Sequence, residues 1–289
     1  MGLEPSREAV ERAYSMGSPC RICPRLCEVD RMDGEKGYCG IGEKPLVASA
    51  GPHYGEEPCL VGRGGSGTIF LSGCNLLCEF CQNASISHGA EGEGADAADI
   101  ATMMLSLQRR GCENINFVTP SHVVPWLMDA VRRARKDELT LPTVYNSGGY
   151  DRVEMLKLLE GTVDIYMPDA KFWESESSER YCDAPDYPER MRESLTEMHR
   201  QVGDLKIVNG VARSGLLVRH LVMPEGVEES REILDFIAKE LSPDTAVNVM
   251  DQYRPCYRAS EYPEIARRPT AGEYAEVRAH ASGLGLRLM

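Results

Sequence analysis

The stretch TIFLSGCNLLCEFCQN, residues 68–83, carries three closely spaced cysteines directly after an apolar run. The run is typical of a buried β-strand, and Cys74, Cys78 and Cys81 follow it with the spacing C-x3-C-x2-C. A closed metal site usually takes four protein ligands, whereas an open site keeps one position for a reactant. Three thiolates can bind three irons of a four-iron cluster. The stretch therefore predicts a cluster whose fourth iron takes a non-protein ligand.

Around this stretch, the sequence alternates between apolar strands and amphipathic helices. In residues 95–110, for example, Ile100, Met103, Met104 and Leu107 recur at helical spacing on one face. The predicted strands are 68–73, 115–119, 142–146, 163–167, 216–223 and 246–251. The helices that follow them are 95–110, 123–136, 153–160, 177–202, 227–241 and 271–282.

This repeated strand-then-helix order implies a parallel sheet with right-handed crossovers. A closed barrel of eight such units takes about 250 residues, so we predict an α/β fold with a partial (β/α)6 TIM-like barrel over residues 59–289. A doubly wound open sheet is the alternative. In both architectures the chemistry lies at the carboxyl ends of the strands, which is where Cys74 follows the first strand.

A second cysteine group lies in residues 1–58, which we predict to be a small N-terminal module with a leading helix. Cys20, Cys23, Cys27 and Cys39 have the spacing C-x2-C-x3-C-x11-C. Four thiolates close a metal site, and both zinc and a [4Fe–4S] cluster fit them. Such a short, loop-rich module needs a metal to stay folded. The zinc-ribbon-like Cys-x2-Cys favours zinc, and a second cluster is the alternative.

Composition and charge exclude several classes of function. The net charge is −13, so the chain lacks the basic field that nucleic-acid binding requires. No apolar run approaches the roughly 18 residues of a membrane span, and no export signal begins the chain. Eleven cysteines in such a chain indicate metal ligands in a reducing, cytoplasmic compartment. The remaining cysteines are isolated in the sequence, and buried, inert thiols are the default expectation for Cys59, Cys112, Cys182 and Cys256. For Cys256, which lies beyond the last strand, a position facing the active site is the alternative.

The C-x3-C-x2-C motif after a first strand, with Phe80 before Cys81, resembles the radical S-adenosylmethionine (SAM) superfamily. The chain is most similar to the pyruvate formate-lyase-activating-enzyme-like branch, in members that have an extra N-terminal cysteine cluster. The matching stretches cover most of residues 60–260: GTIFLSGCNLLCEFCQN, NINFVTPSHVVP, PTVYNSGGY, VDIYMPDAKF, LLVRHLVMPEG and VNVMDQYRP.

The resemblance implies a reaction and its cofactors. The [4Fe–4S] cluster of Cys74, Cys78 and Cys81 would bind SAM and cleave it reductively, and the 5′-deoxyadenosyl radical would abstract hydrogen from a substrate. An electron donor such as flavodoxin or ferredoxin is implied. The substrate is a protein, with glycyl-radical enzymes among the candidates, or a small molecule. The alternative is a non-catalytic iron–sulfur protein for electron transfer or assembly, which would not cleave SAM.

Polar residues at the strand ends are the candidate SAM-binding groups. The Gly-Gly-Glu segment that usually holds the SAM amine is absent, and Thr119 and Ser121 stand in its place, although Ser121 also suits a helix N-cap. Residues predicted to contact SAM are Thr119, Asn146, Ser147, Asp169, Lys171 and Arg219. Asp169 and Lys171 are two apart on an extended chain and therefore point the same way. Arg219 interrupts a buried strand and needs an anionic partner, for which the SAM carboxylate is suited.

Other polar residues near the strand ends have simpler interpretations. His220 points to the face opposite Arg219 if the strand is regular, and we expect a structural histidine. His53, Glu56 and Glu57 lie before the barrel without a helical register, and a structural or hydrogen-bonding role is favoured over metal binding. Residues at the last strand end that the resemblance places near adenine or substrate are Asp251, Gln252 and Tyr253.

Overall fold

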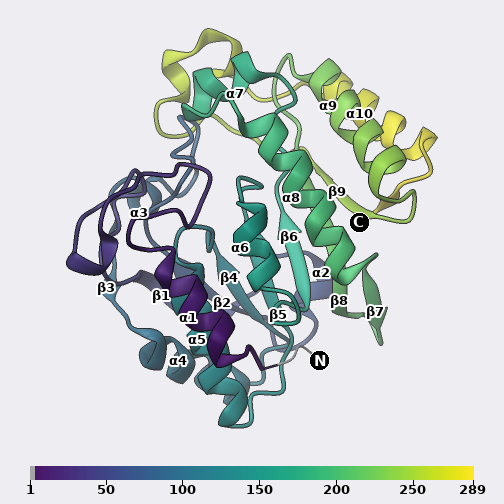
Figure 1. The fold of residues 1–289 in the computed structure, drawn as a ribbon. Helices are drawn as coiled ribbons and strands as arrows, with labels where there is room; N and C mark the ends of the chain where they lie inside the picture. Colours follow the sequence, from purple (N-terminus) through teal and green to yellow (C-terminus); the bar gives the residue numbers. More distant parts are fainter. Residues whose placement is uncertain (1–3) are drawn as a thin grey trace.

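A row of parallel strands forms the middle of one sheet in the computed structural model, which describes residues 4–289 (Figure 1). The order across the sheet is β10-β9-β8-β6-β5-β4-β2-β1-β3, and β7 pairs with β8 off this row. The pairs from β2 to β10 along the row are parallel, and β1, β3 and β7 pair antiparallel. The strands are β1 Leu46–His53, β2 Ser66–Leu71, β3 Glu93–Gly94, β4 Ile115–Val118, β5 Thr143–Ser147, β6 Ile165–Pro168, β7 Lys206–Val208, β8 Val211–Leu221, β9 Ala246–Met250 and β10 Arg287–Leu288.

Helices cross between successive parallel strands (Figure 1). The helices are α1 Arg7–Ser15, α2 Pro58–Val61, α3 Ala84–Ser87, α4 Ala97–Arg109, α5 Val124–Lys136, α6 Val153–Leu158, α7 Ser175–Cys182, α8 Tyr187–Val202, α9 Val227–Phe236 and α10 Ala271–Gly283, of which α1 and α2 precede the first parallel strand. Asp96 and Asp99 form a capping box that begins α4. Within residues 4–289, no helix has both the length and the apolar character that a bilayer crossing requires.

The strand order distinguishes between the two predicted architectures. From β2 through β4, β5, β6 and β8 to β9, each later strand is added on the same side of the sheet. A doubly wound sheet would reverse direction at a switch point, and this row does not. The α/β fold with six β/α units in a partial barrel is therefore confirmed, with the row ending at β10 and β3 and not closing within residues 4–289.

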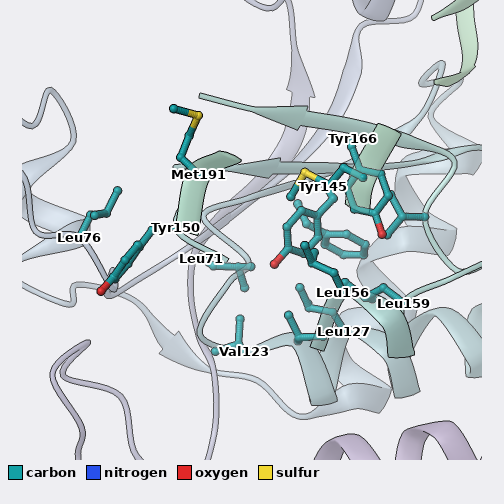
Figure 2. Packing of buried hydrophobic residues seen from close by; sticks show 14 of the residues in the cluster. Leu71, Leu76, Val123, Leu127, Tyr145, Tyr150, Leu156, Leu159, Tyr166 and Met191 are labelled. Carbon is teal, nitrogen blue, oxygen red and sulfur yellow. The ribbon is translucent and has the colours of Figure 1, made fainter. Parts of the chain in front are cut away.

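Strand alternation divides the core into two layers. Tyr145 and Tyr166 face the helices and pack in the large cluster with Leu127 and Leu156, as Figure 2 shows. Their strand neighbours face the opposite side, the barrel interior, where Leu60 of α2 joins the smaller cluster. That smaller cluster includes Val144, Ile165, Met167, Leu217 and Ala246.

Two local departures from the predicted elements have physical causes. The helix predicted over 177–202 is broken between α7 and α8, where Asp183 adopts a left-handed conformation with φ of 48°. Proline at position 188 then lies in the first turn of α8, where its missing N–H costs no hydrogen bond. The strand β1 was not predicted from the sequence. It lies in the predicted N-terminal module, residues 1–58, and pairs with β2 of the predicted barrel. The division at residue 58 stays a prediction.

Candidate active site

The three-cysteine loop leaves β2 at the carboxyl edge of the sheet. Cys74 follows the strand after two residues, and a short turn is closed by the Cys81 N–H, which donates to the Cys78 carbonyl over 3.0 Å. Leu77 in this turn has a φ of 50°, so the loop is tightly wound. The sequence places the three thiols at the predicted edge because β2 ends there.

Cys78 is buried, whereas Cys74 and Cys81 are partly buried and their sulfur atoms accept hydrogen bonds. The Leu76 N–H donates to Cys74 Sγ over 3.3 Å, and Ser87 Oγ donates to Cys81 Sγ over 3.1 Å. Burial, with Cys78 as a further cause, raises the pKa of Cys74 to about 12. Neighbouring thiolates in a largely buried loop repel each other and therefore require a positive charge close by. Soft thiolates are the ligands that iron–sulfur clusters take, so this donor set fits a cluster.

Cys182 is isolated in the sequence but lies beside this loop in the structure. A hydrogen bond with Cys182, together with burial, raises the pKa of Cys78 well above its usual value. Cys182 is the last residue of α7 and is 2% exposed. Sequence reasoning missed this neighbour, because only the path of α7 across the loop brings it there.

A charged network lies at the ends of β5, β6 and β8. Lys171 Nζ lies 2.6 Å from Asp169 Oδ2, and Arg219 Nε lies 2.8 Å from Asp169 Oδ1. Arg219 Nη2 donates to Asn146 Oδ1 over 2.7 Å. The Asp169 side chain is only 16% exposed, so this is not a surface ion pair. The structure brings four of the six predicted SAM-contacting residues together.

Burial disfavours the charged forms of the groups in this network, and the attraction between opposite charges outweighs that effect. Burial pushes the pKa of Asp169 upward, but Arg219 and Lys171 outweigh it and the pKa is lowered. Burial opposes the charge of Lys171 as well, and Asp169 raises its pKa above the usual value. All three groups are therefore ionised at neutral pH.

Glu56 joins this network, although sequence reasoning favoured only a structural or hydrogen-bonding role for it. Its Oε2 lies 3.7 Å from Arg219 Nη1, and its side chain is 9% exposed. Burial raises the pKa of Glu56, with Arg219 opposing. The neighbouring Glu57 accepts a hydrogen bond from Asn248 Nδ2 over 2.9 Å. No sequence signal indicated this, since the contact depends on how the segment before α2 folds back into the barrel.

The interior of the barrel also contains polar atoms without a described partner. Both amide atoms of Asn116 and Oε2 of Glu57 are buried and have no hydrogen-bond partner within residues 4–289. Asn116 lies on β4 between Thr68 and Val144 in the register. Buried polar groups in native proteins are normally bonded to protein, water or a ligand. These atoms are therefore available to a bound polar molecule.

Asn146 and Ser147 point to opposite faces because they are successive residues of β5. Asn146 faces Arg219, whereas Ser147 Oγ donates to Asp151 Oδ2 over 2.6 Å on the helix side. Tyr145, on the same side, donates to Asp151 Oδ1 over 2.8 Å. The Ser147 hydroxyl is thus occupied by the buried Asp151 carboxylate, away from the charged network.

Thr119 lies at the end of β4 in an unusual conformation. Its φ is 62°, which is rare for a β-branched residue, and its N–H donates to the Asn146 carbonyl over 2.9 Å. Strain of this kind collects at functional sites. Ser121 and His122 follow and are buried.

Both ring nitrogens of His220 are hydrogen-bonded within the protein, which agrees with the structural role predicted for it. Its Nδ1 bonds the Ala170 carbonyl over 2.7 Å and its Nε2 bonds Ser230 Oγ over 2.8 Å. At the last strand end, Tyr253 is buried and donates to the Ile265 carbonyl over 2.7 Å, whereas Asp251 and Gln252 are exposed. His53 packs edge-on against Phe70.

The N-terminal cysteines lie close enough together for their charges to interact. Burial raises the pKa of Cys23, and Cys39, Cys20 and Cys27 contribute in the same direction. Among residues 4–289, no three or more Cys, His, Asp or Glu side chains are arranged to hold a single metal ion. Cysteines on a four-iron cluster bind separate irons and do not need to meet at one point.

Known structures share this fold at low sequence identity. A radical SAM methyltransferase from Sphaerobacter thermophilus matches with a TM-score of 0.53 and 12% identity, over 77% of this chain and 65% of that protein. SuiB of Streptococcus suis bound to the precursor peptide SuiA matches with 0.51 and 12%, over 74% and 46%. A structure of anSMEcpe with bound AdoMet matches with 0.50 and 11%, over 73% and 57%. This chain spans about half to two thirds of these proteins, and it has the fold of radical SAM enzymes.

Sequence comparisons place the chain in a family. Residues 60–180 match the family model described as a 4Fe-4S single cluster domain, which includes the three-cysteine loop and excludes the N-terminal cysteines. An uncharacterised protein of Methanocaldococcus jannaschii is 35% identical over 275 residues, covering 91% of this chain and 74% of that protein. The chain belongs to the same family as this archaeal protein.

Proposed function

We propose that this chain is a radical SAM enzyme in which Cys74, Cys78 and Cys81 hold a [4Fe–4S] cluster and SAM is cleaved reductively. A 5′-deoxyadenosyl radical then abstracts hydrogen from the substrate. One observation carries the proposal: the three cysteines of the C-x3-C-x2-C loop, with Cys78 buried and Cys74 and Cys81 partly buried, leave the carboxyl edge of a radical SAM fold beside a network of charged groups. In this role the bound cluster supplies the electron that no side chain can supply.

The charged network has the composition that SAM requires. SAM carries a sulfonium, an ammonium and a carboxylate, so its net charge is positive. Lys171 and Arg219 supply cations for the carboxylate. Asp169, Glu56 and Glu57 supply carboxyl groups for the sulfonium and the ammonium of SAM. Arg219 is held by Asp169, so it acts both as a binding group and as a positioning residue.

Asn146 and Thr119 are the proposed polar contacts. Because Arg219 donates to Asn146 Oδ1, the Asn146 Nδ2 group points away from Arg219 and is left to donate to SAM. Thr119 stands where related sequences carry Gly-Gly-Glu, and we assign its carbonyl or hydroxyl to the SAM amine. The backbone of Ser147 shares the same strand end, whereas its hydroxyl is bound to Asp151.

We place the chain in the pyruvate formate-lyase-activating-enzyme-like branch on its strand-end motifs. The substrate is a protein, with glycyl-radical enzymes as one candidate, or a small molecule. A cavity of about 210 Å³ shares Lys171 with the charged network and is lined also by Tyr181 and Glu229. We assign the approach of the substrate to this cavity. The electron donor is of the flavodoxin or ferredoxin class, in the cytoplasm.

Anaerobic reconstitution tests the function directly. Wild-type protein with dithionite and SAM is expected to form 5′-deoxyadenosine, and Cys78→Ala to form none. Cys112→Ala is the matched control, since Cys112 is buried just before β4, at the strand end opposite to the one that Cys74 follows, and should retain the wild-type rate. A reducible cluster without 5′-deoxyadenosine in the wild type would instead identify a non-catalytic iron–sulfur protein.

A further inference from the structure

The N-terminal cysteine segment packs directly against the three-cysteine loop. Gly73, the residue before Cys74, has a φ of 76°, and a Cβ added there would lie 2.5 Å from the carbonyl oxygen of Cys39. Covalent geometry then places the Cα atoms of Cys39 and Cys74 within about 10 Å of each other. One ligand of each predicted metal site therefore lies against the other site.

A second contact joins the two sites on the other side of Cys74. Arg25 lies between Cys23 and Cys27, and its Nε donates to the carbonyl oxygen of Asn75 over 2.7 Å. Asn75 is 2% exposed, and its Nδ2 donates to the Tyr150 carbonyl over 2.7 Å. Both chain neighbours of Cys74 thus touch the N-terminal segment. Two independent contacts make this closeness a property of the fold and not of one flexible side chain.

The sulfurs of the N-terminal site resemble those of the three-cysteine loop. The Tyr38 N–H donates to Cys27 Sγ over 3.2 Å, as the Leu76 N–H does to Cys74. Cys20, Cys23 and Cys39 are each less than 9% exposed. Hydrogen bonds to sulfur and exclusion of water are the protein's means of setting the reduction potential of an iron–sulfur cluster. Zinc has no redox chemistry and would make no use of a second site so close.

We propose that Cys20, Cys23, Cys27 and Cys39 hold a second [4Fe–4S] cluster that passes single electrons to the cluster at Cys74, Cys78 and Cys81. The relay rests on the proposed function, whereas the second cluster stands without it. A reduced low-potential carrier of the flavodoxin or ferredoxin class gives up one electron, which reduces the N-terminal cluster. Transfer of this electron to the cluster at Cys74, Cys78 and Cys81 reoxidises the N-terminal cluster. The sulfonium of SAM is the final acceptor.

Zinc holds four sulfurs at about 2.3 Å in a tetrahedron, which brings neighbouring sulfurs to about 3.8 Å. Within residues 4–289 neither cysteine group is arranged around a single ion, so the contacts between the two groups carry the choice of a cluster. The contact between Gly73 and Cys39 leaves only a short stretch of protein between the two sites, and electron transfer between two clusters requires such a short path.

Metal analysis of anaerobic, full-length protein tests the second cluster. A Cys78→Ala/Cys81→Ala variant leaves the N-terminal module intact, and we expect it to retain about four irons and four sulfides per chain, against about eight of each in the wild type. Cys112→Ala should match the wild type. One zinc per chain with no sulfide in the double variant would overturn the proposal.

Electron paramagnetic resonance of the reduced wild type tests the relay separately from activity. Two reduced clusters this close should couple magnetically, so the spectrum should differ from the sum of spectra from Cys78→Ala/Cys81→Ala and Cys23→Ala/Cys27→Ala. A simple sum would overturn the relay. The donor gives a second readout: the loss in 5′-deoxyadenosine formation caused by Cys23→Ala/Cys27→Ala should be at least tenfold greater with reduced flavodoxin than with dithionite. Equal fractional losses with the two donors would also overturn the relay.

Failure of the proposed function gives a different pattern. In that case the wild type forms no 5′-deoxyadenosine with either donor, while the iron count and the magnetic coupling still decide the second cluster. Conversely, a wild type that forms 5′-deoxyadenosine but contains only four irons per chain would support the proposed function and overturn the relay. Circular dichroism of each variant shows whether the module has stayed folded.

Discussion

Arg25 Nε donates to the main-chain carbonyl of Asn75 over 2.7 Å, which ties the N-terminal cysteine segment to the residue after Cys74. The same guanidinium donates from Nη2 to the Cys182 carbonyl over 2.7 Å and lies 3.7 Å from the centroid of the Tyr38 ring. A planar group with several donors suits such a junction. Arg25 thus connects the two cysteine groups and the end of α7.

Replacing Arg25 should loosen this junction. Arg25→Ala removes charged hydrogen bonds from carbonyls that are then left without a donor, and we expect a loss of about 2–4 kcal/mol in the free energy of unfolding. The free energy of unfolding of Arg25→Lys should lie between those of the wild type and Arg25→Ala, because an ammonium cannot reproduce the planar fork of the guanidinium. The urea midpoint and the rate of iron loss to a chelator measure both changes.

Arg21 provides the matched control for Arg25. It lies in the same segment, but its side chain is 52% exposed and its partner Glu28 is 61% exposed. Surface ion pairs contribute about 0–1 kcal/mol, so Arg21→Ala should change little. Similar losses for the two variants would contradict the proposed junction.

The parallel strands are predictable from the sequence because they are buried on both faces and read as continuous apolar runs. The strand β1 is not, since Leu46–His53 reads LVASAGPH, whose Gly and Pro indicate a turn. Its pairing with β2 is decided by tertiary contact. The break before α8 was signalled by prolines in CDAPDYPER, which end or begin helices.

Some residues of the candidate site could likewise be predicted from the sequence, and others could not. Asp169, Lys171 and Arg219 were predictable because charges at buried strand ends require partners. That Ser147 turns away from Asn146 follows from strand alternation and was available from the sequence. The place of Glu56 was not, because it enters the barrel from a segment outside the β/α repeat.

Asn146 and Ser147 should respond differently to truncation. Asn146→Ala removes a polar group facing Arg219 and the proposed SAM site, and we expect at least a tenfold fall in the rate of 5′-deoxyadenosine formation. Ser147→Ala removes a donor to the buried Asp151 carboxylate and should mainly cost stability, about 1–3 kcal/mol. Rates per folded protein and urea midpoints separate the two effects. A larger rate loss for Ser147→Ala would contradict this orientation.

The backbone of Thr119 offers a test of strain. At a φ of 62° glycine is relaxed, whereas a β-branched residue costs of order 1 kcal/mol or more. Thr119→Gly should therefore stabilise the protein by about 1 kcal/mol, measured by thermal unfolding. Thr119→Ser keeps the hydroxyl. If Thr119 contacts SAM through that hydroxyl, only Thr119→Gly should weaken SAM binding, measured by isothermal titration. Equal affinities for the two variants would assign the contact to the carbonyl.

His122 gives the protein a defined dependence on pH. The ring is 1% exposed, its Nε2 bonds the Ser72 carbonyl over 2.9 Å, and Nδ1 is buried without a partner among the described residues. Burial, aided by Arg31, lowers the pKa of His122 to about 3. The unfolded-state pKa is about 6.5, so the folded state resists protonation. Its contribution to stability is complete above pH 6.5 and is lost as the pH falls towards 3.

The expected loss from His122 between pH 7.0 and pH 5.5 is about 1 kcal/mol. His122→Gln keeps an amide donor for Ser72 and cannot titrate, so its free energy of unfolding should fall less than that of the wild type by about this amount. Between pH 7 and pH 8 the difference between the two proteins should stay constant, because the imidazole is then neutral in both states. Urea unfolding at each pH measures this difference. Parallel curves from pH 8 to pH 5.5 would show that His122 can be protonated in the folded protein, which would mean that water reaches the ring beside Ser72.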